Sequence, residues 1–431
     1  MTVLIHIIFL MIFSISFVGC TPSSLQNSEF DPTFGSQGKV ITDFFGADDV
    51  VSAITAQSDH KIIAVGYATE NQRKHLAISR YLPGGTLDLT FSEDGKQIHD
   101  FLEDSEAVAV HTDAKKNILV LGRRYSLSTS EIVLVRFSQH GTLDTSFGTN
   151  GTVIWSLSGA KLYPGALKLT SDGKILVGGG NLNFTTPCFT LARFLANGNF
   201  DSSFGNAGVA TSVMSADEQR IQSIVTDAQN RIIVGGFGKV GPLGDFALAR
   251  FSDSGVLDTT FGISGKRLVD FSNGLTTSDD SIHTLMIDSD QKITAMGSVD
   301  NSIYRSFAVA RFTDLGGLDV SFATQGKKQI PFERNGVQFS LSSQAAIETS
   351  EGKIYAVGKV NFGTDEDLTI TRLSSAFELD LIFGNLGTYA LDFFFKNDEA
   401  RALQSIQGKV VVAGSTETID GSKDFLLLRL K

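Results

Sequence analysis

The stretch LDTTFGISGK, residues 257–266, is one copy of a pattern that returns along the whole chain of 431 residues. The pattern consists of an apolar residue, Asp, two variable residues and Phe. It occurs seven times, and successive copies lie 56 to 61 residues apart, ending at Phe34, Phe91, Phe147, Phe204, Phe261, Phe322 and Phe383. A fixed period of this length indicates a repeat architecture in which each unit packs on its neighbours.

Two further elements keep the same phase. One is a basic residue, an apolar run and Gly, as in residues 61–66 (KIIAVG), and only Asn117 breaks its basic position. The other is an Arg at the end of an apolar run, at Arg80, Arg136, Arg193, Arg250, Arg311, Arg372 and Arg429. Three independent elements in one phase indicate seven structural units.

Each unit holds four short runs that are rich in β-branched and aromatic residues and are separated by turn signals, without a useful helical period. In the first unit the predicted strands are residues 50–57, 61–67, 76–81 and 96–101. Four strands in about 57 residues are typical of a propeller blade. The sequence therefore predicts an all-β, seven-bladed β-propeller of four-stranded blades.

The two ends of the repeat region indicate how the ring closes. The first motif copy, at residues 31–39, has no strands before it, and the last unit has no motif copy after Arg429. We therefore expect residues 39–44 to pair beside residues 425–430 as the outer strand of the last blade. Such a mixed blade leaves no unpaired edge at the seam.

The units resemble the delta-60 repeats of bacterial surface and secreted proteins, and more distantly the NHL-type propellers. The resemblance rests on the LDxTFGxxGK motif and covers residues 30–431, with Ser92 and Ala323 in place of the motif Gly in two units. It implies a repeat fold in an envelope protein and brings no general catalytic motif.

The N-terminus predicts export. Residues 1–19 are apolar and end in small residues, as a signal peptide does. Residues 16–20 (SFVGC) resemble the lipobox of bacterial lipoproteins, which implies lipidation of Cys20, a tether over residues 20–29 and a propeller over residues 30–431. Thr21 in place of Asp favours the outer membrane. The alternatives are an ordinary signal peptide or an anchor helix that keeps Cys20.

The amino-acid composition limits the classes of molecule that the protein is expected to bind. The formal net charge is −11, and no basic run is present, which argues against nucleic acid and anionic lipid surfaces. Cys188 is the only other cysteine, so lipidated Cys20 leaves no intrachain disulfide, and we expect a buried, inert thiol. We expect a monomer whose fold depends on its core.

The repeated charged residues have a structural interpretation. A residue that is present in every unit is expected to meet a structural requirement that all the units share. The motif Asp is expected to cap a turn, and the strand-end Arg to bind a carboxylate or turn carbonyls. The motif Phe is expected to fill the space between blades.

A candidate site is instead predicted where acidic residues precede the innermost strand of five units. A ring of carboxylates at one channel mouth would bind Ca²⁺ or a cationic ligand, since hard cations prefer several oxygen ligands. The alternative is that these acids are solvated turn residues. The predicted ligands are Asp49, Glu106, Glu218, Asp280 and Glu399.

Catalytic groupings are missing from the sequence. It contains no Gly-x-Ser-x-Gly or Walker motif, no dinucleotide fingerprint between a strand and a helix, and only scattered histidines. We therefore expect a binding or scaffold propeller for a protein, peptide or glycan, without catalytic residues and without a certain cofactor. The alternative is a propeller enzyme, a polysaccharide lyase or hydrolase, with its site at the channel mouth.

Overall fold

The computed structural model describes residues 29–431 except 126–128, 158–160, 183–186, 241–242, 273–277, 302, 335 and 364. The expected signal segment, Cys20 and the tether up to residue 28 lie outside the described residues. The described part is all-β and contains no helix. It accordingly offers no helix with the length and hydropathy that a membrane crossing needs.

The described strands form six hydrogen-bonded sheets, most of them four-stranded and antiparallel. The first contains β2 (Asp49–Ala56), β3 (Ile62–Glu70), β4 (Arg73–Tyr81) and β5 (Lys96–His99). Two others contain β14 (Gln219–Thr226), β15 (Ile232–Val240), β16 (Leu243–Phe251) and β17 (Lys266–Val269), and β18 (Asp279–Ile287), β19 (Ile293–Asp300), β20 (Arg305–Phe312) and β21 (Lys327–Ile330).

One sheet has eight strands. It contains β6 (Ser105–Thr112), β7 (Ile118–Tyr125), β8 (Ser130–Phe137) and β9 (Thr152–Trp155), followed by β10 (Lys161–Leu169), β11 (Ile175–Leu182), β12 (Cys188–Phe194) and β13 (Val209–Ser212). The two halves are joined by a single parallel bridge between Lys161 and Ser130.

A fifth sheet has an additional short strand. It contains β22 (Phe332–Arg334), β23 (Val337–Glu348), β24 (Ile354–Asn361), β25 (Glu366–Leu373) and β26 (Thr388–Leu391). Here β22 pairs with the start of β23, which is 12 residues long. The sequence did not predict this extra hairpin.

The last sheet joins the two ends of the chain, as expected. It contains β27 (Asp398–Ile406), β28 (Lys409–Glu417), β29 (Lys423–Arg429) and, at its outer edge, β1 (Lys39–Thr42). The register places Lys39 opposite Leu428 and Thr42 opposite Phe425, which confirms the predicted pairing. Phe30 adds a bridge to Leu430.

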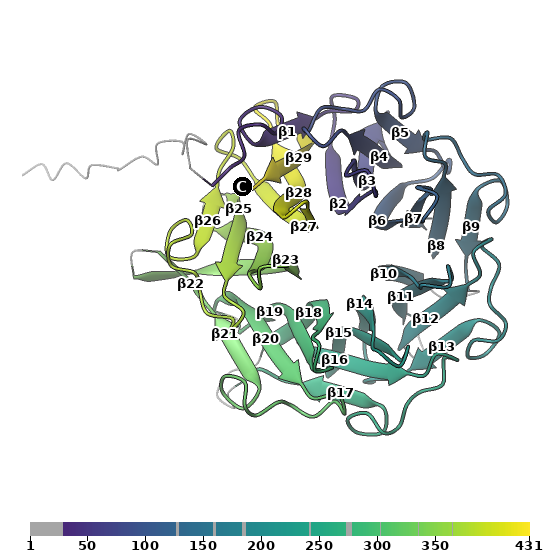
Figure 1. The fold of residues 1–431 in the computed structure, drawn as a ribbon, viewed down its shortest axis with the longest axis vertical. Coiled ribbons are helices and arrows are strands. Elements are labelled where there is room, and N and C mark those ends of the chain that lie inside the picture. Colours follow the sequence, from purple (N-terminus) through teal and green to yellow (C-terminus); the bar gives the residue numbers. More distant parts are fainter. Residues whose placement is uncertain are drawn as a thin grey trace, which may run out of the picture.

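The sheets are arranged in a ring (Figure 1). The innermost strands β2, β6, β10, β14, β18, β23 and β27 contact one another in this order, and β27 contacts β2. Apolar side chains of neighbouring sheets pack together between them; one such cluster contains Phe34, Val51, Val411 and Phe425. The core is therefore distributed around the ring.

The predicted strands of the first unit are displaced by a few residues. The largest differences are the end of β3, at Glu70 instead of residue 67, and the start of β4, at Arg73 instead of residue 76. Asn71 and Gln72 both have positive φ, 51° and 66°, and Glu70 pairs with Arg73. Two positive φ values define a tight hairpin turn that keeps both strands in register up to the turn, so β3 and β4 extend beyond the prediction.

The repeated charged residues have the structural role that the sequence predicted. Asp88 accepts hydrogen bonds from the backbone and the hydroxyl of Thr90, and its other oxygen lies 2.8 Å from Nε of Arg80. Arg80 lies over the ring of Phe91 at 4.8 Å and donates to the carbonyl of Gln139 in the next unit. The equivalent arginines Arg136, Arg193, Arg250 and Arg429 also donate to a carbonyl of the next unit, so these contacts tie neighbouring units together.

Candidate functional site

Each innermost strand contains a β-bulge at the level of the repeated Gly on the adjacent strand. A Cβ at Gly66 would lie 1.8 Å from the carbonyl oxygen of Val50, so the neighbouring strands approach too closely for any side chain. At the same level the register of β2 shifts between Val51 and Ala53, which leaves Ser52 as the extra residue of a β-bulge. The other innermost strands carry the same bulge, with extra residues Val108, Gly165, Gln222, His283, Gln344 and Arg401.

These bulge residues all line one cavity of about 350 Å³. Glu106, Ala107, Arg123, Pro164 and Arg220 complete its lining. The volume is within the range of small-ligand pockets, roughly 300–1,000 Å³. Because all the innermost strands contribute, the cavity lies at the centre of the ring.

Three arginines supply most of the charge in this cavity. Arg123 lies 3.0 Å from Glu106, Arg220 lies 3.2 Å from Glu218, and Arg401 lies 2.7 Å from Glu399. Burial and, more weakly, the charge of Arg220 lower the pKa of Arg123. Nε of Arg123 is buried and has no hydrogen-bond partner among the described residues.

Aromatic and imidazole groups complete the chemistry of the cavity. The ring of Tyr163 lies 5.0 Å from the Arg123 guanidinium and 4.6 Å from that of Arg220, which holds both guanidinium planes in place. Burial lowers the pKa of His283 to about 4, so its imidazole is neutral at pH 7. The cavity therefore combines planar hydrogen-bond donors, amides and one neutral base.

The structure separates the five predicted metal ligands. Glu106 lines the cavity, and Glu218 and Glu399 bind cavity arginines, so none of the three carboxylates is left without a cation. Asp49 and Asp280 lie elsewhere, each in a group with two other aspartates between neighbouring sheets. The acids do not form one ring.

The separation follows from strand geometry. Asp49 and Asp280 stand three residues before the bulge, Glu106 and Glu399 two residues before it, and Glu218 four. A shift of one residue turns a side chain to the opposite face of a strand. Sequence proximity to the innermost strand was therefore an insufficient criterion for a shared site.

Sequence reasoning also missed the bulge residues. In six units the bulge residue stands 14 positions before the repeated Gly, as Ser52 does before Gly66, and in the last unit, Arg401 before Gly414, it stands 13 before. This position is occupied by Ser, Val, Gly, Gln, His, Gln and Arg in turn. Variation at a fixed place in an otherwise regular repeat was the signal that would have identified the cavity.

Cys188 is buried, as expected, and burial raises the pKa of its thiol. A larger groove of about 730 Å³ lies against Arg136 and Asp144. These are motif residues that recur in every unit, so this groove has no feature specific to one place in the ring.

Comparison with known proteins supports the fold class. Residues 57–91, 170–204, 230–261 and 408–431 match the family described as "Domain of unknown function (DUF5122) beta-propeller". No curated protein matches the sequence. The chain is a repeat protein with a β-propeller fold.

Solved structures that match this chain share little sequence with it. Virginiamycin B lyase from Staphylococcus aureus, in a catalytically inactive form with quinupristin, is 11% identical with a TM-score of 0.49, over 90% of this chain and 98% of the other. The polysaccharide lyase Uly1 is 12% identical with a TM-score of 0.49, over 88% and 89%. Sqt1 from Chaetomium thermophilum is 11% identical with a TM-score of 0.41, over 90% and 97%.

Proposed function

We propose that the chain is a seven-bladed propeller lipoprotein of the outer membrane that binds an acidic glycan in its central cavity. The blade count treats the eight-stranded sheet as two blades, since one bridge alone joins its halves. The seven sequence repeats support this count.

One observation in particular supports the proposed binding function. The repeated residues are used in turns, ion pairs and the contacts between units, whereas the bulge residues, which differ from unit to unit, converge on the central cavity. A site that evolves separately from its scaffold has this distribution, because loops and irregular positions vary while packing is kept.

The lining indicates the class of ligand. Arginine presents several donors in a plane that matches a carboxylate, and Gln222 and Gln344 add amides that donate and accept. These groups suit a sugar segment that carries hydroxyl and carboxylate groups. The volume suits one short segment of such a glycan better than a protein surface.

Arg401→Gln tests this assignment. Arg401 is a bulge residue with 39% of its side chain exposed, so it is accessible to ligand. Loss of one charge-assisted hydrogen bond, about 1.5–3 kcal/mol, should weaken binding of hexuronate oligosaccharides roughly 10- to 150-fold in calorimetric titration. Arg73→Gln, which breaks an exposed ion pair with Asp100 outside the cavity, is the control and should bind normally. Equal affinity for the two variants, or no binding by wild type, would refute the proposal.

A second function, cleavage of the same ligand, has one supporting observation. A neutral His283 and the three arginines line one cavity, with Tyr163 against two of them. Proton abstraction beside a carboxylate needs a base of this kind and a cation on the carboxylate. The appearance of unsaturated products when wild type, but not His283→Gln, is incubated with the oligosaccharides would replace the binding function by a lyase activity.

The membrane anchor is tested separately. If Cys20 carries lipid, Cys20→Ser should move the protein from the membrane fraction to the soluble fraction without changing its fold. Fractionation followed by circular dichroism measures both. A Cys20→Ser chain that stays in the membrane with residues 1–19 attached would instead establish an N-terminal anchor helix.

A further inference from the structure

Three junctions between neighbouring sheets contain the same group of aspartates, which we call aspartate trios. In each, one Asp follows the outermost strand, a second lies opposite it on the adjacent strand, and a third lies at the start of the next sheet's innermost strand. The trios are Asp43, Asp424 and Asp49; Asp270, Asp245 and Asp280; and Asp392, Asp367 and Asp398. In the first two trios every carboxylate offers an oxygen within 4.8 Å of the others, whereas at the third junction the carboxylates that do so are those of Asp392, Asp367 and Asp365.

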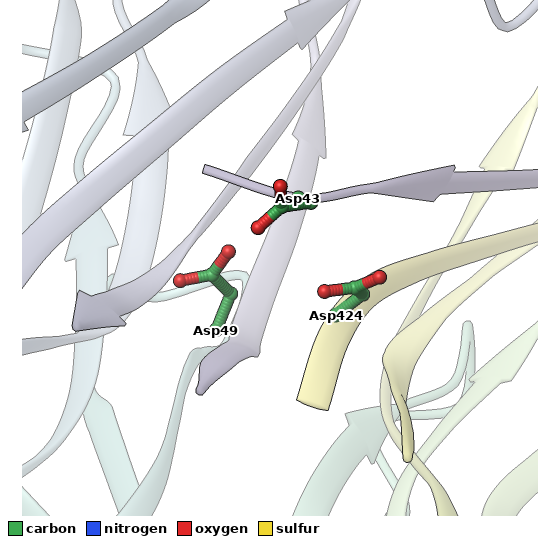
Figure 2. Close-up of side chains that lie close together, drawn as sticks. All are labelled: Asp43, Asp49 and Asp424. Carbon is green, nitrogen blue, oxygen red and sulfur yellow. The ribbon is translucent and has the colours of Figure 1, made fainter. Parts of the chain in front are cut away.

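The first trio shows the geometry (Figure 2). Asp43, Asp49 and Asp424 each offer an oxygen within 4.8 Å of the others, and their carboxylates face a common point. Asp49 is fully buried and accepts a hydrogen bond of 2.6 Å from the backbone N–H of Phe44. Asp280 and Asp398 accept the corresponding bonds from the N–H groups of Phe271 and Phe393, so the same local backbone arrangement recurs at all three junctions.

The trios contain buried oxygens that nothing else in the described structure satisfies. Asp424 is 8% exposed, and its carboxylate forms no hydrogen bond or ion pair with the described residues and points into the first trio. Oδ1 of Asp280, a residue that is 0% exposed, is buried without a hydrogen-bond partner among the described residues. The nearby Lys96 ammonium donates to the carbonyl of Asp43 and not to a carboxylate. Buried carboxylates of this kind require a partner.

At one junction the three positions of the trio carry no carboxylate, and a side-chain amide supplies the positively polarised group. Gln219 occupies the place of Asp49, and Cys188 and Val213 occupy those of Asp424 and Asp43. Gln219 accepts the equivalent hydrogen bond, 2.6 Å from the N–H of Met214, and its amide nitrogen donates to the carbonyls of Pro187, Ser215 and Asp217. The partly positive amide nitrogen of Gln219 therefore binds the backbone carbonyl oxygens that surround this place.

We propose that each aspartate trio binds one Ca²⁺ ion between two neighbouring sheets. Ca²⁺ takes about six to eight oxygen ligands in flexible geometry, so carboxylate oxygens within 4.8 Å of one another can share one ion. Mg²⁺ demands near-ideal octahedral geometry and usually keeps several waters, which favours Ca²⁺ between two packed sheets. Of the five metal ligands expected from the sequence, these sites include Asp49 and Asp280 but not Glu106, Glu218 or Glu399.

Calorimetric titration of the full-length chain in detergent, after chelator treatment, tests the proposal at pH 8. Wild type should bind up to three Ca²⁺ and gain thermal stability that increases with the logarithm of free Ca²⁺. Asp424→Asn, Asp245→Asn and Asp367→Asn should each remove one site, and the triple variant should lose both the heat and the midpoint shift. In the absence of Ca²⁺ the triple variant should remain folded, because it loses only charge repulsion.

The matched control is Asp290→Asn, an exposed aspartate in a turn outside the trios, which should bind as wild type does. The Ca²⁺ sites are independent of the glycan cavity, so Arg401→Gln should leave them unchanged. No heat and no midpoint shift for wild type at millimolar Ca²⁺, or an unchanged response in the folded triple variant, would overturn the proposal. Shared protons would then be what stabilises the trios.

Discussion

Deletion of residues 30–44 should abolish cooperative folding of the ring. This segment carries β1, the bridge from Phe30 to Leu430, and the ion pair between Asp31 and Arg429 at 2.9 Å. It also buries Phe34 completely and places Phe44 against the ring of Phe425. Removing one buried Phe side chain costs about 3–5 kcal/mol, and a domain is stable by only about 5–15 kcal/mol.

Thermal unfolding followed by circular dichroism measures this effect. Deletion of residues 21–28, which precede Glu29 and its contacts with Arg372 and Lys431, is the control and should leave the midpoint within a few degrees of wild type. Phe34→Ala, a milder change, should lower the free energy of unfolding by about 3–5 kcal/mol. Equal midpoints for the two deletions would show that the ring closes elsewhere.

The second large effect is expected for Asp88→Ala. This change leaves Arg80, whose side chain is 3% exposed, without its carboxylate, and also frees Lys61 from a contact of 2.8 Å. Breaking a buried pair by removing one partner costs about 3–5 kcal/mol, because the remaining charge stays buried. Denaturation with guanidinium should show a loss of this size relative to wild type.

A more accessible ion pair provides the control for Asp88→Ala. Asp59→Ala removes a carboxylate whose partner, Lys116, is about as exposed as Asp59 itself, and it should cost about 0–1 kcal/mol. A loss at Asp88 no greater than at Asp59 would contradict the structural role of the motif Asp.

The pH dependence of the free energy of unfolding tests the role of Asp88 independently. Burial raises the pKa of Asp88, but hydrogen bonds from Lys61 and Thr90 and the charge of Arg80 outweigh it and bring the pKa to about 2. A lowered folded-state pKa gives stability that is present above the unfolded value, about 3.9, and lost as the pH falls toward 2. The difference between wild type and Asp88→Ala should therefore shrink over that range.

The sequence by itself determined the repeat, the all-β class, the pairing at the seam and the structural use of the motif Asp and Arg. Each follows from local chemistry that every unit repeats: alternating apolar runs, turn residues, and a charge that needs a nearby partner. The seam was predictable because residues 39–44 and 425–430 each lacked the partner that the other supplies.

Tertiary structure alone decided where the sites lie. The bulge at Ser52 and its equivalents turns one residue of each innermost strand toward the centre, and neighbouring residues alternate between faces. As a result Glu106 faces the cavity, whereas Asp49 joins Asp43 and Asp424, which is 375 residues away along the chain. Side-chain direction and long-range neighbours depend on strand register and ring closure, and neither is encoded in the spacing of acidic residues along the sequence.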